Sequence, residues 1–155
     1  MTEEVILLLH PTFGVLGMLA AVWVFVEALN ASPPGIERMR SAARLSAVFM
    51  WISYLIAGYF YVFLYGPDKA IIKAGPWPFA HNLVTETKEH VFLMLLLLAT
   101  FLPIAAAGDV ARSRGVRRVV LWSSALVVLL VLFMEGSGAV MSVGAKLGYA
   151  AQAAG

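Results

Sequence analysis

Long apolar runs, separated by short polar segments, dominate the chain. Four of them approach or exceed the roughly 20 residues that a helix needs to cross about 30 Å of hydrocarbon. We expect spans at about 5–29, 43–65, 85–107 and 117–143. The connections show neither an internal repeat nor a second domain. The pattern therefore predicts one all-α domain over residues 1–155, an up-down bundle of four transmembrane helices.

The basic residues predict an orientation. Cytoplasmic loops of membrane proteins carry an excess of Lys and Arg, so the first and third connections should face the cytoplasm. Both termini and the middle connection, residues 66–84, should then lie outside, where the middle connection would form an ordered cap. We expect a lipid-embedded protein of a bacterial inner, or plasma, membrane. The arginines of the two connections are Arg38, Arg40, Arg112, Arg114, Arg117 and Arg118.

Composition supports the membrane class. Hydrophobic residues make up 61% and charged residues 13% of the chain, whereas soluble domains carry roughly 25% charged residues. There is no cysteine, which excludes disulfides and thiolate metal ligands. The net charge of +2 is too small to indicate a nucleic-acid partner.

Polar groups that enter a membrane are rare and are functional candidates by default. His10 lies within the first span, His90 opens the third, and Glu86 precedes His90 by one helical turn. Glu135 lies about a turn from the outer end of the fourth span, and His81 lies in the outer connection. With a rise of about 1.5 Å per residue, all of them should lie toward the outer side.

Several of these residues also have ordinary structural interpretations. Glu86 would favour the positive end of a helix dipole, and Lys88 is expected to extend to the lipid head groups. His10 precedes Pro11, so it would be only a capping residue if the helix began at that proline. Glu27 is expected to form a boundary salt bridge with an arginine of the first connection or with Arg44.

A strip of small residues, Gly14, Gly17 and Ala21, follows His10 on the same helix face. Such a strip would accept either a flat macrocycle or a closely packed helix. Two imidazoles on parallel helices at similar depth would ligate one iron from both sides, and bundle cores commonly hold such cofactors. A bis-imidazole iron suits electron transfer.

The four spans, together with LLLHPTFGVLGMLA and HNLVTETKEHVFLM, resemble small membrane-embedded b-type cytochromes. The resemblance implies one haem b near the outer face, with His10 and His90 as axial ligands and His81 as a substitute for either. It also implies electron exchange with quinol or an outside redox partner, as an electron-transfer subunit rather than a stand-alone enzyme.

Two other function classes remain open. His10, Glu86, His90 and Glu135 would form a non-haem site for iron, copper or zinc, because mixed His and carboxylate ligands suit these ions. Alternatively, the chain is a cofactor-free subunit that binds a quinone or has a structural role. In each case we expect a protein partner or a homo-oligomer.

Overall fold

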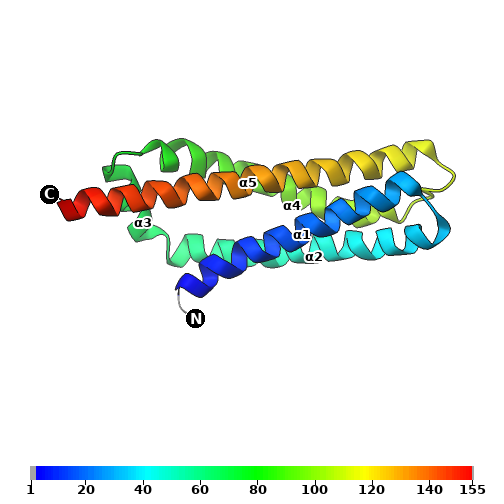
Figure 1. The fold of residues 1–155 in the computed structure, drawn as a ribbon, viewed down its shortest axis with the longest axis horizontal. Coiled ribbons are helices and arrows are strands. Elements are labelled where there is room, and N and C mark those ends of the chain that lie inside the picture. Colours follow the sequence, from blue (N-terminus) through cyan, green and yellow to red (C-terminus); the bar gives the residue numbers. More distant parts are fainter. Residues whose placement is uncertain (1–2, 155) are drawn as a thin grey trace.

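The computed structural model describes residues 3–154, and this part of the chain is helical with no strand (Figure 1). The all-α prediction is therefore confirmed for these residues. Met1, Thr2 and Gly155, which the single-domain prediction includes, lie outside the described residues. The elements are α1 (Glu3–Asn30), α2 (Pro33–Phe63), α3 (Gly66–Ala74), the π-helix η1 (Ala80–Thr85), α4 (Glu86–Ala106) and α5 (Arg114–Ala154).

The four long helices form a bundle in which each packs against two others. α1 contacts α2 and α5, and α4 contacts the same two helices. Among the described residues, α1 and α4 make no close contact, nor do α2 and α5, so these pairs lie diagonally across the bundle. Figure 1 shows that the chain reverses direction between successive long helices.

The connection between α1 and α2 is shorter than expected. α2 begins at Pro33, within the connection that the sequence pattern predicts, and leaves a turn of only Ala31 and Ser32. The Ser32 hydroxyl accepts a hydrogen bond from the Gly35 N–H at 3.2 Å, and Pro33 and Pro34 occupy the first turn. A serine N-cap followed by proline is a strong helix start, which explains the early beginning of α2.

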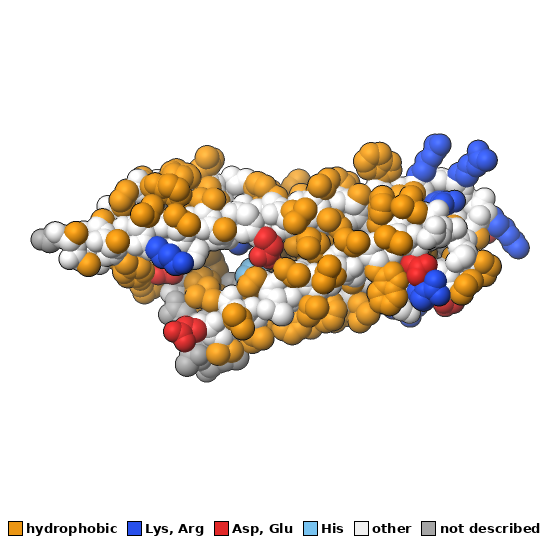
Figure 2. Space-filling model, in the orientation of Figure 1, with side chains coloured by type: hydrophobic (Ala, Val, Ile, Leu, Met, Phe, Trp, Pro, Cys, Tyr) orange, Lys and Arg blue, Asp and Glu red, His pale blue; other side chains and the backbone are white. Residues whose placement is uncertain are grey.

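Four helical stretches are long and apolar enough to cross a membrane: residues 4–30, 33–63, 80–106 and 114–154. Their outward side chains are mostly apolar, with Leu8 70%, Leu97 74% and Trp122 70% exposed. Figure 2 shows this apolar surface along the bundle, with Lys and Arg gathered at the end that carries the α1–α2 and α4–α5 connections. Soluble monomers rarely expose an apolar surface of this extent, which is typical of an integral membrane protein.

Arginines hold the helix ends together at this arginine-rich end. Arg117 donates to the Ala28 carbonyl at 2.7 Å and to the Leu29 carbonyl, at the end of α1. Arg40 donates to the Ala106 carbonyl at 3.2 Å, at the end of α4. The last carbonyls of a helix have no partner within the helix and carry partial negative charge. Each arginine therefore joins the start of one helix to the end of another.

At the opposite end, α5 extends well past its neighbours. Its 41 residues correspond to about 60 Å of helix. α3 and η1 pack against its last part, where two glycines allow the backbones to meet. A Cβ at Gly148 would lie 2.7 Å from the Ile71 carbonyl oxygen, and one at Gly75 would lie 2.8 Å from the Gly148 Cα. The predicted outer cap over residues 66–84 is thus attached to α5 by glycine contacts.

Candidate functional site

His10 lies inside the bundle rather than at a helix start. α1 continues through Pro11 without interruption. The ring Nδ1 lies 3.1 Å from the Ser53 carbonyl oxygen and 2.9 Å from its Oγ, and the Ser53 hydroxyl donates to the His10 carbonyl at 3.0 Å. Because a carbonyl only accepts, Nδ1 carries the proton. The Nε2 atom therefore keeps its lone pair for another partner.

Lys88 and Glu135 lie close to this histidine. A Cβ at Gly14 would be 3.0 Å from Oε1 of Glu135 and 3.6 Å from Oγ of Ser53. A Cβ at Gly138, which is one turn beyond Glu135 on α5, would be 3.3 Å from Nζ of Lys88. The Lys88 charge acts on both the His10 ring and the Glu135 carboxylate. We call His10, Ser53, Lys88 and Glu135 the four-helix polar site, since each long helix supplies one member.

The members of the four-helix polar site share one level in the bundle. Each lies roughly 18 to 21 residues along its own helix from the arginine-rich end, a rise of about 27 to 32 Å. Among the described residues, the ion pairs within 4.0 Å are Glu27–Arg38 and Glu37–Arg40, so the Lys88 and Glu135 charges stay apart. Figure 2 shows a hollow between α1 and α5 with an acidic and a histidine side chain at its edge.

His90 and Glu86 do not join this site. Both side chains are exposed on α4, where they line an open groove of about 350 Å³ together with Asn82 and Thr87. The Nδ1 atom of His90 donates to the Glu86 carbonyl at 2.7 Å. Residues two apart on a helix point about 200° apart. Since Lys88 faces the bundle interior, His90 faces outward, and the structure does not bring it together with His10.

His81 belongs to a separate buried network in the cap that α3 and η1 form. It is 3% exposed, and its Nδ1 lies 3.0 Å from the Tyr65 hydroxyl, which also lies 3.3 Å from the Thr85 hydroxyl. Burial raises the pKa of the Tyr65 phenol, more strongly than its hydrogen bond with Thr85 lowers it. The π-helix η1 positions His81 and Thr85 for these contacts.

The glycine strip below His10 is largely filled by α2. A Cβ at Gly17 would overlap the methyl group of Met50, and the Ser46 hydroxyl donates to the Gly17 carbonyl at 2.9 Å. The strip therefore serves helix packing at Gly17, whereas Gly14 opens toward the four-helix polar site. In residues 3–154, no group of three or more His, Cys, Asp and Glu side chains is placed to hold a metal ion. Haem ligation by His10 and His90 stays a prediction.

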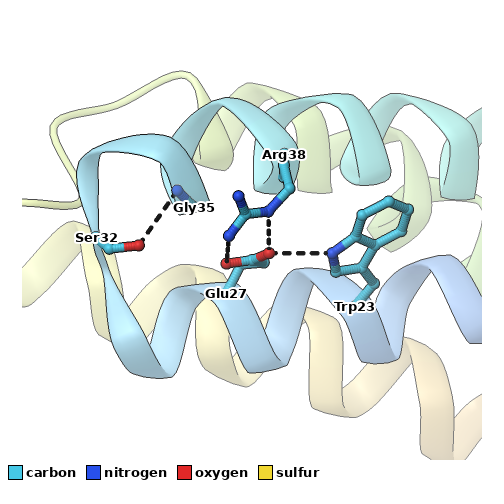
Figure 3. Close-up of polar contacts among 5 residues, drawn as sticks. All are labelled: Trp23, Glu27, Ser32, Gly35 and Arg38. Atoms are coloured by element: carbon cyan, nitrogen blue, oxygen red, sulfur yellow. Dashed lines mark hydrogen bonds and ion pairs between the residues drawn. The ribbon is translucent and has the colours of Figure 1, made fainter.

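The expected boundary salt bridge of Glu27 is confirmed at the arginine-rich end. Arg38 donates to both carboxylate oxygens, at 2.5 and 3.1 Å, and the Trp23 ring N–H donates at 3.2 Å (Figure 3). The Trp23 donor comes from α1 and the Arg38 donors come from α2, close to the Ser32 cap (Figure 3). These contacts explain Glu27 as a structural clamp of the α1–α2 turn.

The sequence predicts that Lys88 extends to the lipid head groups, whereas the structure directs its side chain into the interior of the helix bundle. Helical periodicity contained the signal, because Leu95, Ala99 and Leu102 form the buried face of α4 and Lys88 precedes them at helical spacings of seven, eleven and fourteen residues.

Searches of known protein families, curated proteins and solved structures found no match to this chain.

Proposed function

We propose that the chain is an integral membrane protein whose four long helices cross the bilayer in alternating directions. The arginine-rich end would face the cytoplasm, in a bacterial inner membrane, and the cap of α3 and η1 would lie outside. Two features support this orientation. Exposed arginines gather at one end of the bundle, and the apolar stretches match the hydrocarbon thickness of about 30 Å.

Within this orientation, we propose that the four-helix polar site binds the polar head of a quinone. A level about 30 Å from the arginine-rich end lies at the outer boundary of the hydrocarbon. Quinone rings with apolar tails reach such a boundary from within the bilayer. The hollow between α1 and α5 (Figure 2) would give the ring access to the site.

The chemistry of the site matches a neutral ligand with two carbonyl oxygens. Lys88 has three N–H donors for carbonyl oxygens, whereas the Ser53 hydroxyl already donates to the His10 carbonyl and holds the histidine in place. The formal charges of Lys88 and Glu135 cancel when His10 is neutral, so the site carries no excess charge for an ionic ligand. Quinone reduction consumes two electrons and two protons. Glu135 and His10 would exchange the protons, and a redox partner would supply the electrons.

The observation that carries this proposal is the convergence of one polar side chain from each long helix at a single level. Ionisable groups at such a depth are costly to bury and usually serve a site or a pathway. Neither Lys88 nor Glu135 has a direct ion-pair partner among the described residues. A bound polar head would complete their hydrogen bonding.

The proposal is tested by titrating the purified protein in detergent with a short-chain benzoquinone in a calorimeter. Replacing Lys88 by Met should weaken binding by roughly 10- to 140-fold, the equivalent of losing one charge-assisted hydrogen bond of about 1.5–3 kcal/mol. The double variant Lys88→Met/Glu135→Leu removes both charges together, so that neither is left unpaired, and should also fail to bind. His90→Ala is the matched control on the outward face of α4, and its affinity should stay unchanged. Equal affinity in all four proteins would refute the assignment.

A second proposal, haem b held by His10, is favoured by the hydrogen bonding of the imidazoles. Nδ1 of His10 and Nδ1 of His90 each face a backbone carbonyl, which leaves Nε2 free in the manner of metal-ligating histidines. An absorption spectrum of the purified protein tests this directly. A haem gives a Soret band, which His10→Ala should abolish and His81→Ala should preserve. Loss of the band in His90→Ala as well would require α4 to turn this outward-facing ring toward His10. Equal haem content in the three variants would contradict the ligand assignment. A colourless protein would refute the haem proposal and would not affect the quinone proposal.

A further inference from the structure

An open groove of about 510 Å³ lies at the arginine-rich end, between the last turns of α4 and the first turns of α5. Its lining is almost entirely apolar, and Ile104, Phe101 and Val119 are exposed by 67%, 42% and 43%. The close approach of the two helices here depends on Gly108, where a Cβ would lie 2.8 Å from a methyl group of Val116. The groove is thus an apolar channel on the outer surface of the bundle.

Three arginines lie in the segment of chain that supplies Ser113, Gly115 and Val119 to this groove. Arg112, Arg114 and Arg118 are all exposed, and none of their side chains has a hydrogen-bond or ion-pair partner in residues 3–154. Arg117, by contrast, is directed at the end of α1. The nearby acidic residue is Asp109, which accepts from the Arg112 backbone N–H at 3.1 Å. The mouth of the groove is therefore strongly positive.

The first turn of α5 does not itself provide a free anion site. The Ser113 hydroxyl already accepts a hydrogen bond from the Val116 N–H at 3.3 Å. Binding of an anion here would depend on the three arginine side chains. Positive side chains beside an apolar groove suit a ligand that has an anionic head and an apolar chain.

We infer that this groove binds an anionic phospholipid, with an acyl chain against the apolar lining and the phosphate between Arg112, Arg114 and Arg118. The inference rests on the membrane orientation proposed above and is independent of the four-helix polar site. Basic pockets between helices on the cytoplasmic side suit anionic head groups. A free phosphate would gain nothing from the apolar lining, and a zwitterionic lipid would gain little from the arginines.

The test measures the lipid that stays bound after the protein is extracted from vesicles of equal parts phosphatidylglycerol and phosphatidylcholine, by native mass spectrometry. The unaltered protein should retain phosphatidylglycerol preferentially. The triple variant R112Q/R114Q/R118Q should lose this preference by about fivefold per arginine, since each basic residue near the surface contributes about 1 kcal/mol. The triple variant K69Q/K73Q/K146Q removes the same charge at the opposite end and should retain phosphatidylglycerol as before.

Two further arms separate the acyl chain from the phosphate. Gly115 lines the groove, and a Cβ there would meet the Ser113 hydroxyl oxygen at an ordinary 3.8 Å. Gly115→Phe places a large side chain at the lining and should release lipid while every arginine remains. Inorganic phosphate alone should not displace the lipid. If the arginine variant does not fold, raising the salt concentration on the unaltered protein replaces it and should weaken retention.

Equal retention of the two lipids by the unaltered protein would overturn the inference. So would loss of the preference in the lysine variant, or its persistence in the Gly115→Phe and arginine variants. Displacement by inorganic phosphate alone would assign the arginines to a free anion instead. Failure of the protein to fractionate with membranes would instead refute the proposed membrane insertion, which separates the two failures.

Discussion

The close contact of α3 with α5 allows a quantitative prediction for the variant Gly148→Ala. In Gly148→Ala, the new methyl group would lie 2.6 Å from Cγ2 of Ile71 and 2.7 Å from its carbonyl oxygen, whereas carbon atoms prefer about 3.5–4.0 Å. One of the two neighbours is backbone, so rotation of the Ile71 side chain alone does not relieve the overlap. α3 must move away from α5 by roughly 1 Å.

Overpacking of this kind costs about 1–3 kcal/mol. The cost falls on the contact of α3 with α5 rather than on the bundle, so local opening of α3 should become roughly 5- to 140-fold more frequent. Hydrogen–deuterium exchange of the backbone amides in residues 66–75 measures this opening directly. We expect faster exchange there and unchanged exchange in α1 and α2.

Gly136→Ala is the matched control on the same helix, because a Cβ at that position would meet nothing within 4 Å. Its intrinsic effect is favourable, since Ala is a better helix former than Gly by about 1 kcal/mol. Exchange in α3 should therefore be unchanged. If the two alanine variants exchange alike in α3, the glycine contacts do not hold the cap and the reasoning is wrong.

Two further predictions concern side chains at opposite ends of the bundle. Arg117→Gln should lower the stability of the bundle by about 1–2 kcal/mol, because the last carbonyls of α1 lose a charged donor; thermal unfolding in detergent measures the loss, and Arg118→Gln, whose side chain is exposed, should not reproduce it. Tyr65→Phe should be less stable than the unaltered protein at neutral pH. The pKa of the buried phenol is raised above its ordinary value of about 10, so the stability that the neutral phenol contributes is complete below that pH and declines as pH rises through the folded-state pKa. The difference between the two proteins should therefore shrink in alkali, and a difference that grows with pH would contradict this account.

Much of the architecture follows from local features of the sequence. Apolar runs long enough for a membrane mark the four long helices, because a helix satisfies its backbone hydrogen bonds within its own segment. The ends of the helices were predicted less accurately from the sequence. The Ser32 cap and two prolines start α2 early, and α5 runs on to Ala154 through a glycine-rich segment whose helical state depends on packing against α3 and η1.

In the candidate site, too, the sequence predicts some residues and helix packing decides others. His10 and Glu135 were recognisable because each stands alone directly after an apolar run, whereas the row of polar residues from Glu86 to His90 offers several side chains of similar chemistry. Only one or two of these can face the interior, because neighbours on a helix diverge by about 100° per residue. The sequence shows that ionisable side chains lie at this level of the bundle. It does not show which residue between Glu86 and His90 faces the interior.

The sequence by itself determined the helical class, the four apolar stretches, the basic end and the presence of ionisable groups near the other end. Hydrophobicity and charge are properties of residues, so these conclusions needed no coordinates. The rotation of each helix about its axis was decided by tertiary packing, since it depends on which faces fit together around the bundle. That rotation places Lys88 inside with His10 and Glu135, turns His90 outward, and sets Gly17 against Met50.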